Sequence, residues 1–442
     1  MTVSLAAATG PARAADLSDA LTLTGRYRVR YEALDGRVQP GQAGSDQILV
    51  QKALLGAQFD AGPVYLGAEL LDARAWLDDT GTPLGTDDVN TVELLRGYVG
   101  TRGRGLLSKG DRYDIILGRI TMDVGSRRFV ARNRFRNTIN GFTGLRGQWT
   151  GPGGDRVQAF FTLPVARRPG DVASLLDNEA DIDQELPRTR FWGVHVARPE
   201  LLPGLSFEAF AFWLDENDGD RTASLDRSLF TPGVRFVAKP APGRFDGEVE
   251  AAFQVGESSR SRDADAPHLE HRAGFVHAEI GYTFEDRLNT RLSLQYDFAS
   301  GDTDPSDNQN NRFDTLFGAR RFDFGPTGIY GIFARTNINT PGIRLSAAPS
   351  SRWTGFARYR PVFLAAARDA LPTFGVTDPS GASGRFLGHQ TEFRIRHNII
   401  PGAVRLETGA AWLAQGRFLR EAPNAARDGD TFYAYAQTTF AF

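Results

Sequence analysis

A regular alternation of polar and apolar residues constrains the fold of this chain more than any other feature. Over residues 21–33, one face includes Leu, Leu, Tyr, Val, Tyr and Ala, and the other includes Thr, Thr, Arg, Arg, Arg and Glu. A period of two places successive side chains on opposite faces of a β-strand, so this segment predicts a strand with one apolar and one polar face. No run of 18 or more apolar residues occurs in the chain. Its absence excludes a membrane protein built from helices.

The same alternation recurs along the whole chain. It is clear at 157–163, 245–255, 288–298 and 404–412. Less regular versions lie near 47–59, 63–71, 91–100, 111–119, 142–150, 190–198, 205–214, 233–239, 272–284, 329–338, 342–347, 353–364, 386–397 and 431–442. Together with 21–33 these are nineteen candidates, of which we expect one or two to be miscounted. A bacterial single-chain barrel has an even number of strands, so the sequence predicts about eighteen.

The predicted fold is therefore all-β: a transmembrane antiparallel β-barrel of about 18 strands, with short periplasmic turns and long extracellular loops. Tight turns are expected at 201–204, 239–243 and 400–402. Long polar loops are expected at 35–46, 72–90, 167–189, 215–230, 256–271, 299–328, 365–385 and 414–430. A soluble β-sandwich array or propeller is the alternative, but a propeller repeats at fixed intervals and the chain has no such repeat. A mean hydropathy of -0.32 fits a barrel, because a wet lumen and loops are averaged with a lipid-facing band.

Both ends of the chain indicate export to the bacterial outer membrane. Residues 1–14 are apolar near their start and end in Ala12-Arg13-Ala14, which fits a signal-peptide cleavage site. The segment is short and lacks the usual positive start, so we interpret it as a truncated signal peptide rather than a disordered tail. Residues 15–442 are then one barrel domain. Phe440 and the terminal Phe442 share one face of the last predicted strand, as in other outer-membrane barrels.

Arginine dominates the basic residues. Only three of the 51 basic residues are lysines (Lys52, Lys109 and Lys239), so 48 are arginines, against 53 acidic residues. Codon bias is the simplest explanation of this ratio, but arginine is also the side chain that binds a carboxylate with two parallel hydrogen bonds. A net charge of -2 argues against a nucleic-acid-binding protein.

Two blocks of residues resemble a known family. The first contains Ile116-Leu117-Gly118-Arg119, Gly125-Ser126-Arg127-Arg128-Phe129-Val130, Arg136-Asn137-Thr138 and Phe142-Thr143-Gly144-Leu145-Arg146. The second contains Tyr296-Asp297-Phe298-Ala299-Ser300-Gly301-Asp302, Phe313-Asp314-Thr315-Leu316-Phe317 and Gly328. Their order and content resemble the alginate export family of outer-membrane barrels. The chain departs from the common pattern at Ile120, Thr143 and Ala319-Arg320-Arg321. The resemblance therefore predicts the fold better than it predicts the substrate.

The resemblance implies a monomeric pore with an arginine-rich lumen that conducts an acidic polysaccharide outward. We accordingly predict a passive channel for an anionic saccharide, with export of an alginate-like polyuronate as the leading hypothesis. Uptake of acidic sugars or other anions is the alternative within transport, and a plugged structural or adhesin barrel is a third. The sequence shows no motif that places a serine or carboxylate nucleophile beside a base. The sequence leaves open whether a separate periplasmic export partner is needed.

Polyuronate transport requires weak cationic sites in series, each attractive enough to admit a carboxylate and weak enough to release it. The segment 127–136 holds five arginines and is predicted to line or fold toward the constriction. Polar-face arginines of strands, with Arg74 and Arg119 added on the resemblance, form a second group. The predicted pore-lining residues are Arg74, Arg119, Arg127, Arg128, Arg132, Arg134, Arg136, Arg146, Arg291, Arg394 and Arg396, and Arg26, Arg28 and Arg30 share the polar face of the first strand.

Carboxylates on the polar faces are expected to pair with some of these arginines and to prevent overly tight binding. The predicted counter-charges are Glu69, Glu248, Glu250, Asp297 and Glu392. No cofactor is expected. Asp302, Asp304 and Asp307 could offer oxygen ligands to calcium, but a polar loop containing proline is the simpler interpretation, so no metal site is predicted.

Overall fold

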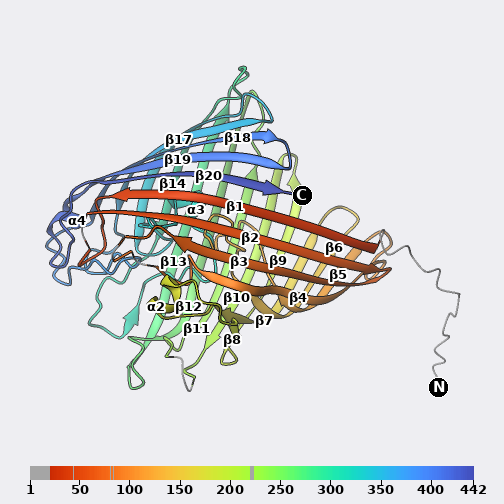
Figure 1. The fold of residues 1–442 in the computed structure, drawn as a ribbon, viewed down its shortest axis with the longest axis horizontal. Coiled ribbons are helices and arrows are strands. Elements are labelled where there is room, and N and C mark those ends of the chain that lie inside the picture. The colour runs from red at the N-terminus through yellow and green to blue at the C-terminus, as the bar shows by residue number, and fades with distance from the viewer. Residues whose placement is uncertain (1–19, 43, 80, 83, 220–222) are drawn as a thin grey trace, which may run out of the picture.

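The computed structural model describes residues 20–42, 44–79, 81–82, 84–219 and 223–442. The predicted signal peptide, residues 1–14, lies outside the described residues. The described chain forms a closed antiparallel β-barrel with eighteen wall strands (Figure 1). The wall strands are β1 (Leu21–Asp35), β2 (Ser45–Ala61), β3 (Val64–Trp76), β4 (Asn90–Arg104), β5 (Arg112–Ile120), β6 (Phe142–Thr150), β7 (Arg156–Ala166), β9 (Thr189–Leu202), β10 (Leu205–Glu216), β11 (Ser228–Ala238), β12 (Arg244–Ser259), β13 (His268–Thr283), β14 (Arg291–Ala299), β16 (Ile338–Ala347), β17 (Trp353–Phe363), β18 (Phe386–Ile400), β19 (Val404–Gln415) and β20 (Thr431–Ala441). The two-residue strands β8 (Gln184–Glu185) and β15 (Gln309–Asn310) lie in loops.

Pairing of the first and last strands closes the barrel. The register of β1 against β20 runs from Arg26 opposite Ala441 to Asp35 opposite Phe432. Closure leaves no strand edge open to another chain. The predicted count of eighteen is confirmed, and the surplus candidate is the segment 329–338. It lies in the connection between β14 and β16, where Tyr330, Ile332 and Phe333 are buried.

The two ends of the barrel differ in their connections. The end with short connections, which we call the turn end, contains 62–63, 105–111, 151–155, 203–204, 239–243, 284–290, 348–352 and 401–403. The opposite loop end contains 36–44, 77–89, 121–141, 167–188, 217–227, 260–267, 300–337, 364–385 and 416–430, with the short helices α2 (Val172–Leu176), α3 (Arg321–Phe324) and α4 (Arg417–Glu421). Within the described ranges, no helix is long and apolar enough to cross a membrane.

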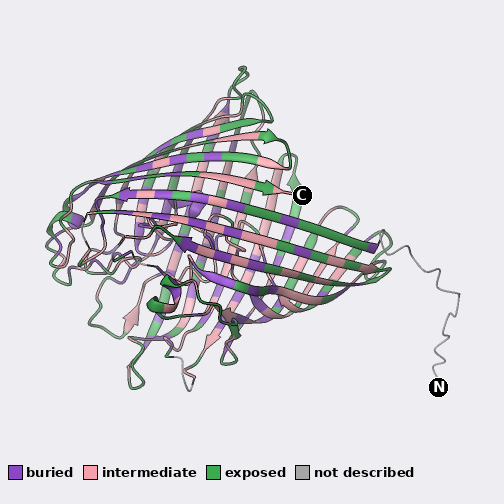
Figure 2. Cartoon of the chain, in the orientation of Figure 1, coloured by how far each residue is buried: buried purple, intermediate pink, exposed green. Residues whose placement is uncertain are grey.

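The alternation of the sequence becomes an outward apolar face and an inward polar face. In β1, Leu21 and Leu23 are exposed outward, whereas Arg28 and Arg30 point inward and are buried. Side chains directly opposite each other on paired strands share a face, so the register assigns every wall residue to one side. Exposed and buried residues alternate along the strands in Figure 2. The exposed apolar side chains suit contact with lipid, and the buried charges line the lumen.

Two connections from the loop end fold into the lumen and pair with each other. Segment 121–141 follows β5, and segment 300–337 follows β14. The N–H of Ala131 donates to the carbonyl of Phe317, and the N–H of Phe317 donates to the carbonyl of Phe129, both at 2.9–3.1 Å. Phe129 also packs against Phe210 and Phe275 of the wall. The lumen is therefore narrowed by two segments that are fixed to one another and to the strands.

Candidate functional site in the lumen

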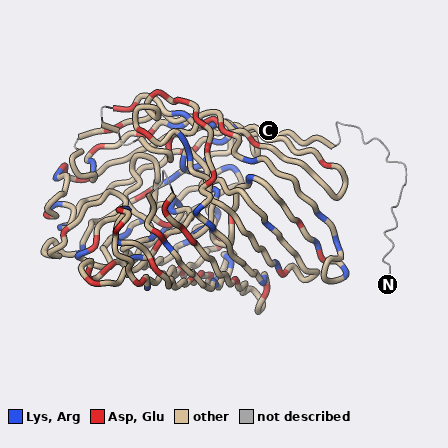
Figure 3. The backbone as a smooth tube through the Cα atoms, turned by 90° about the horizontal axis from the view of Figure 1, so that it is seen from below, with Lys and Arg blue, Asp and Glu red and all other residues tan. Residues whose placement is uncertain are grey.

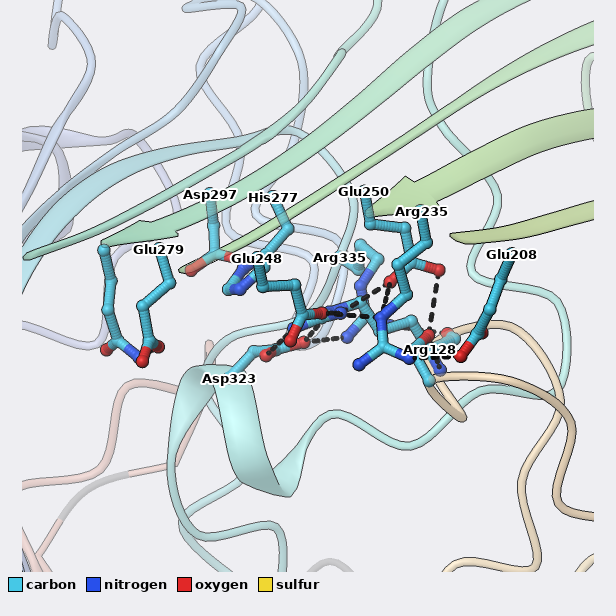
Figure 4. Close-up of polar contacts among 12 residues, drawn as sticks. Arg128, Glu208, Arg235, Glu248, Glu250, His277, Glu279, Asp297, Asp323 and Arg335 are labelled. Atoms are coloured by element: carbon cyan, nitrogen blue, oxygen red, sulfur yellow. Dashed lines mark hydrogen bonds and ion pairs between the residues drawn. The ribbon is translucent and has the colours of Figure 1, made fainter. Parts of the chain in front are cut away.

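Arg128 ties both inward segments to the wall strand β12 (Figure 4). Its guanidinium donates to both carboxylate oxygens of Asp323 in α3, at 3.0 and 3.1 Å, and to Glu248 and Glu250 of β12. Asp323 also binds Arg335. The side chain of Arg128 is only 5% exposed. An arginine with three carboxylate partners and so little exposure has no free donor for a passing anion, so Arg128 holds the inward segments in place.

Neighbouring residues extend this arrangement, which we call the strut cluster: Arg128, Glu208, Arg235, Glu248, Glu250, Asp323 and Arg335. Arg235 of β11 donates to Glu208 at 2.9 Å and to Glu248 at 3.0 Å. The Arg335 guanidinium donates to the carbonyl of Arg128 at 2.6 Å. Nearby, the ring of His277 lies 2.7 Å from Asp297. Positive and negative groups in this sector of the wall therefore compensate each other at close range.

A second set of contacts holds segment 121–141 against β1 and β2. The Arg28 guanidinium donates to the carbonyls of Arg134 at 3.0 Å and Phe135 at 2.8 Å. Arg30 donates to the carbonyl of Phe135 at 2.6 Å, and the Lys52 ammonium donates to the carbonyl of Arg136 at 2.7 Å. This stretch of the inward segment has no strand or helix to pair its carbonyl groups, so wall cations supply the missing donors.

A cavity of about 1020 Å³ lies between these inward segments and the turn end of β1, β18, β19 and β20. Charged residues gather in the middle of the molecule and in the loops when it is seen from below (Figure 3). Eleven cationic side chains line the cavity, against the two carboxylates Glu69 and Glu407. The cations are Arg26, Arg28, Lys52, Arg127, Arg132, Arg134, Arg136, Arg321, Arg394, Arg396 and Arg405. We call this space the cationic cavity.

Among the residues that the structure describes, three of these guanidinium groups form neither an ion pair nor a hydrogen bond: those of Arg26, Arg127 and Arg394. Arg127 lies over the ring of Phe322 at 5.3 Å, and Arg394 lies over the ring of Phe356 at 4.7 Å. By contrast, Arg132 is held by both oxygens of Glu69, at 2.7 and 2.8 Å. A guanidinium with no carboxylate partner retains donors for a carboxylate from outside the protein.

The structure brings six of the eleven predicted pore-lining arginines into the cationic cavity: Arg127, Arg132, Arg134, Arg136, Arg394 and Arg396. Arg128 belongs to the strut cluster. Arg146 and Arg291 also point into the lumen, but each is bound to wall carboxylates outside the cavity. Arg146 meets Asp114 at 2.7 Å, and Arg291 meets Asp246 at 2.9 Å.

The structure places Arg74 and Arg119 on the outward side, which does not agree with the prediction that they line the pore. Arg74 lies opposite Gln51 and pairs with Asp72 at 3.0 Å, in register with the exposed Leu55 and Leu70. Arg119 follows the exposed Leu117 in the outward set of β5. It binds Glu93 and Glu185 at the point where β4 and β5 stop pairing. Neither side chain lines the cationic cavity.

The five predicted counter-charges all point inward, and each meets a cation. Glu69 binds Arg132, and Glu248 and Glu250 bind Arg128. Glu392 binds Arg321 and Arg358, and Asp297 lies beside His277 and 3.6 Å from Arg360. The predicted loop aspartates bind locally: Asp304 accepts from Ser306, and Asp307 accepts from the N–H of Gln309. Among the described residues, Asp302, Asp304 and Asp307 do not come within ligand distance of one another.

Sequence reasoning missed three cations of the cavity: Lys52, Arg321 and Arg405. The sequence pattern does indicate that Arg405 faces the lumen, because this residue alternates with the apolar Val404 and Leu406. Lys52 lies on an inward face that also carries Ile48 and Val50, so the pattern of β2 did not separate the two faces. Arg321 lies in an irregular connection, where no period exists.

Comparison with known proteins supports this architecture. The family model described as alginate export matches residues 19–432. None of the curated proteins compared with the chain matches it. The chain is similar to the outer membrane protein OpdK from Pseudomonas aeruginosa, at 11% identity and a TM-score of 0.60, covering 96% of this chain and 99% of that one.

Two further solved structures have the same fold. OpdK with vanillate matches at 13% identity and a TM-score of 0.59, over 96% of this chain and 99% of that chain. OccAB1 of Acinetobacter baumannii matches at 11% identity and a TM-score of 0.60, over 96% of this chain and 97% of that chain. At such identities the likeness establishes the fold alone, a β-barrel.

Proposed function

This chain belongs to the alginate export family of outer-membrane channels, and we propose that it exports an alginate-like polyuronate through its lumen as a passive monomeric channel. Short turns mark the periplasmic end of outer-membrane barrels, and both ends of the described chain lie there. The cationic cavity therefore opens toward the periplasm. A polymer that is made inside the cell would meet this cavity first.

The observation that carries the proposal is the charge of the cavity lining, with eleven cations against two carboxylates. A polyuronate carries one carboxylate on each sugar, so several neighbouring sugars can be attracted at once. Most of the lining cations are partly engaged by carbonyl groups, amide groups or carboxylates, whereas the guanidinium groups of Arg26, Arg127 and Arg394 have neither an ion pair nor a hydrogen bond among the described residues. This mixture suits transport, because each site attracts a carboxylate without holding it tightly.

Uptake of small acidic sugars or other carboxylates is the second candidate. OpdK, whose fold is similar, has been solved with vanillate, which is a small carboxylate. A cavity of about 1020 Å³ also has room for such a molecule. Export and uptake share the cationic lining and differ in the size of the cargo and the side from which it enters. A barrel that conducts nothing, as an adhesin would, is the third candidate.

Single-channel recording of the purified protein in planar bilayers distinguishes these candidates. We expect an anion-selective conductance that oligouronates block when added at the turn end, with longer blocks for longer oligomers. The blocks should shorten when the salt is raised from 0.1 M to 1 M, because the Debye length falls from about 10 Å to about 3 Å. Block by monomeric acids alone would favour uptake. A cation-selective conductance that ignores oligouronates would overturn the proposal, and no conductance at all would favour the adhesin.

A further inference from the structure

Phe322 is an aromatic side chain left facing a charged cavity. It belongs to the four-residue helix α3, in which Arg321, Asp323 and Phe324 are all buried. Phe322 is only partly buried, and it lines the cationic cavity. Leaving a phenyl ring in contact with water forgoes the stabilisation that burial would give. This exposure is therefore a feature that needs an explanation.

The neighbours of Phe322 fix its ring in this position. Arg321 binds Glu392 of the wall, and Asp323 binds Arg128 and Arg335. The carbonyl of Phe322 itself accepts a hydrogen bond from Arg358 at 3.0 Å. Turning the ring into the core would break these contacts. The strut cluster and the wall thus hold α3 so that its one exposed side chain points to the cavity.

Arg127 completes the arrangement from the other inward segment. Its guanidinium lies 5.3 Å from the centre of the Phe322 ring and has no carboxylate partner among the described residues. The Arg127 backbone has a φ of 72°, in the left-handed region that residues other than glycine rarely adopt. The N–H of Ala319 donates to the Arg127 carbonyl at 2.9 Å, which links the two segments at this point. Strain of this kind persists only where the surroundings impose it, and it concentrates at functional sites.

We propose that Arg127 and Phe322 form a subsite for one uronic-acid residue. The inference rests on the proposed function and adds to it a means of selecting sugars over other anions. A uronate carries a carboxylate at the edge of a pyranose ring, and the ring has an apolar face of C–H groups. Arg127 can bind the carboxylate while the apolar face packs on Phe322. Arginine alone attracts any carboxylate, whereas the aromatic ring adds contact area only for a cargo with such a face.

Two other phenylalanine rings line the cavity. Phe135 is covered by Arg30 at 4.1 Å and Arg321 at 4.8 Å, and it packs edge-on against Tyr435 at 5.2 Å. Phe442 lies against Gly25 at the turn end and has no arginine of the described ranges over its ring. The arginines nearest the Phe322 ring, Arg127 at 5.3 Å and Arg128 at 5.5 Å, lie farther from it than those that cover Phe135. Phe322 is therefore the lining ring that combines a partly open face with an arginine that has no carboxylate partner in the described part of the chain.

Block of single channels by two probes of equal charge tests the subsite. The probes are an oligouronate and an oligoglutamate with the same number of carboxylates, and the variants are Phe322→Leu and Phe322→Tyr. We expect Phe322→Leu to shorten the oligouronate blocks about three- to tenfold, the range given by an aromatic contact, and to change the oligoglutamate blocks by less than twofold. Phe322→Tyr should restore the oligouronate blocks. Phe374→Leu, a partly buried phenylalanine outside the cavity, is the matched control and should change neither.

The outcomes separate this inference from the proposed function. Equal shortening of both probes by Phe322→Leu would mean that the ring acts only through the shape of the pore and would overturn the subsite. Oligouronate blocks of unchanged duration in Phe322→Leu would also overturn the subsite. That result would not contradict the proposed transport of polyuronate. If neither probe blocks the unmodified channel, the proposed function fails, and the subsite fails with it. An unchanged conductance in KCl shows that a variant is folded.

Discussion

Two sectors of the lumen wall use the same side chain in opposite ways. In the sector formed by β10 to β14, Arg128 and Arg235 are surrounded by Glu208, Glu248 and Glu250 and fix the inward segments. In the sector formed by β18 to β20 and β1, Arg394 and Arg26 face open space in the cationic cavity. The strut sector sets three arginines against four carboxylates. The cavity sector sets eleven cations against two carboxylate side chains.

The difference shows that the number of nearby carboxylates, rather than the presence of arginine, decides what an inward arginine does. A buried arginine needs partners, because an uncompensated charge in a poorly hydrated site is costly. An arginine beside a water-filled cavity is hydrated and tolerates a missing partner. The struts hold the inward segments in place, and these segments carry Arg127, Arg132 and Arg134 into the cavity. The strut sector thus positions part of the cavity sector.

The largest effect is expected from breaking the strut cluster with Arg128→Met. The substitution leaves Glu248, Glu250 and Asp323 without their shared partner. We expect a loss of about 3–5 kcal/mol in the free energy of unfolding, which is the usual result of removing one member of a buried ion-pair network. Denaturant unfolding in detergent measures the loss. A loss of less than 1 kcal/mol would mean that Arg128 is not a strut.

A change of selectivity without a change of stability is expected in the cavity sector. The double variant Arg26→Gln with Arg394→Gln removes two cations that face no carboxylate among the described residues. The ratio of anion to cation permeability should fall roughly two- to fourfold, because water screens the two charges and each attracts an anion about 4 Å away by only about 1 kcal/mol. The free energy of unfolding should change by less than ~1 kcal/mol. Reversal potentials in a salt gradient give the ratio.

Arg74→Gln is the matched control for the double variant. Arg74 is an arginine of similar exposure, but it lies on the outward face beside Asp72. Its loss should leave the permeability ratio unchanged. If Arg74→Gln lowers anion selectivity as much as the double variant does, the assignment of the two faces is wrong.

The smallest effect concerns the loop end, where Asp88 lies beside the buried Arg30–Glu32 pair. Burial, together with the nearby charges of Asp87 and Glu32, raises the pKa of the Asp88 carboxyl to about 7. The folded protein therefore keeps this proton between about pH 4 and pH 7, where the unfolded chain has lost it. Stability from this group is complete below pH 4 and is lost as the pH rises through 7.

Asp88→Asn removes the group that titrates and keeps an oxygen for the N–H of Gly85. We expect the variant to gain stability relative to the unmodified protein as the pH rises from about 4.5 to about 8, because only the unmodified protein has to lose a proton whose pKa is raised in the folded state. Denaturant unfolding at the two pH values measures the difference. Parallel pH profiles for the two proteins would contradict the assignment.

Most of the wall strands were predictable, because each barrel strand shows an alternation of polar and apolar residues within its own sequence. The alternation at 21–33 located β1 and both of its faces. The same reasoning failed at 329–338, whose apolar residues Tyr330, Ile332 and Phe333 are buried in a connection, with Tyr330 packed against Tyr433 of β20. The family resemblance placed Arg74 in the lumen, whereas the register of β3, which continues to Trp76, places it outward. Local pattern cannot distinguish a strand from a buried loop, and it cannot extend a register past irregular residues.

The sequence by itself determined that the chain crosses a membrane as a barrel of about eighteen strands, with its arginines mostly on the inner faces. The alternation of polar and apolar residues and the lack of long apolar runs are local properties. They can be recognised without knowing which residues from elsewhere in the chain lie nearby. Only the tertiary structure decided which arginines are struts and which line the cavity. That assignment depends on carboxylates far away in sequence, as when Asp323 and Glu250 meet Arg128. Charge compensation acts through space at a few ångströms, and the fold alone sets those distances.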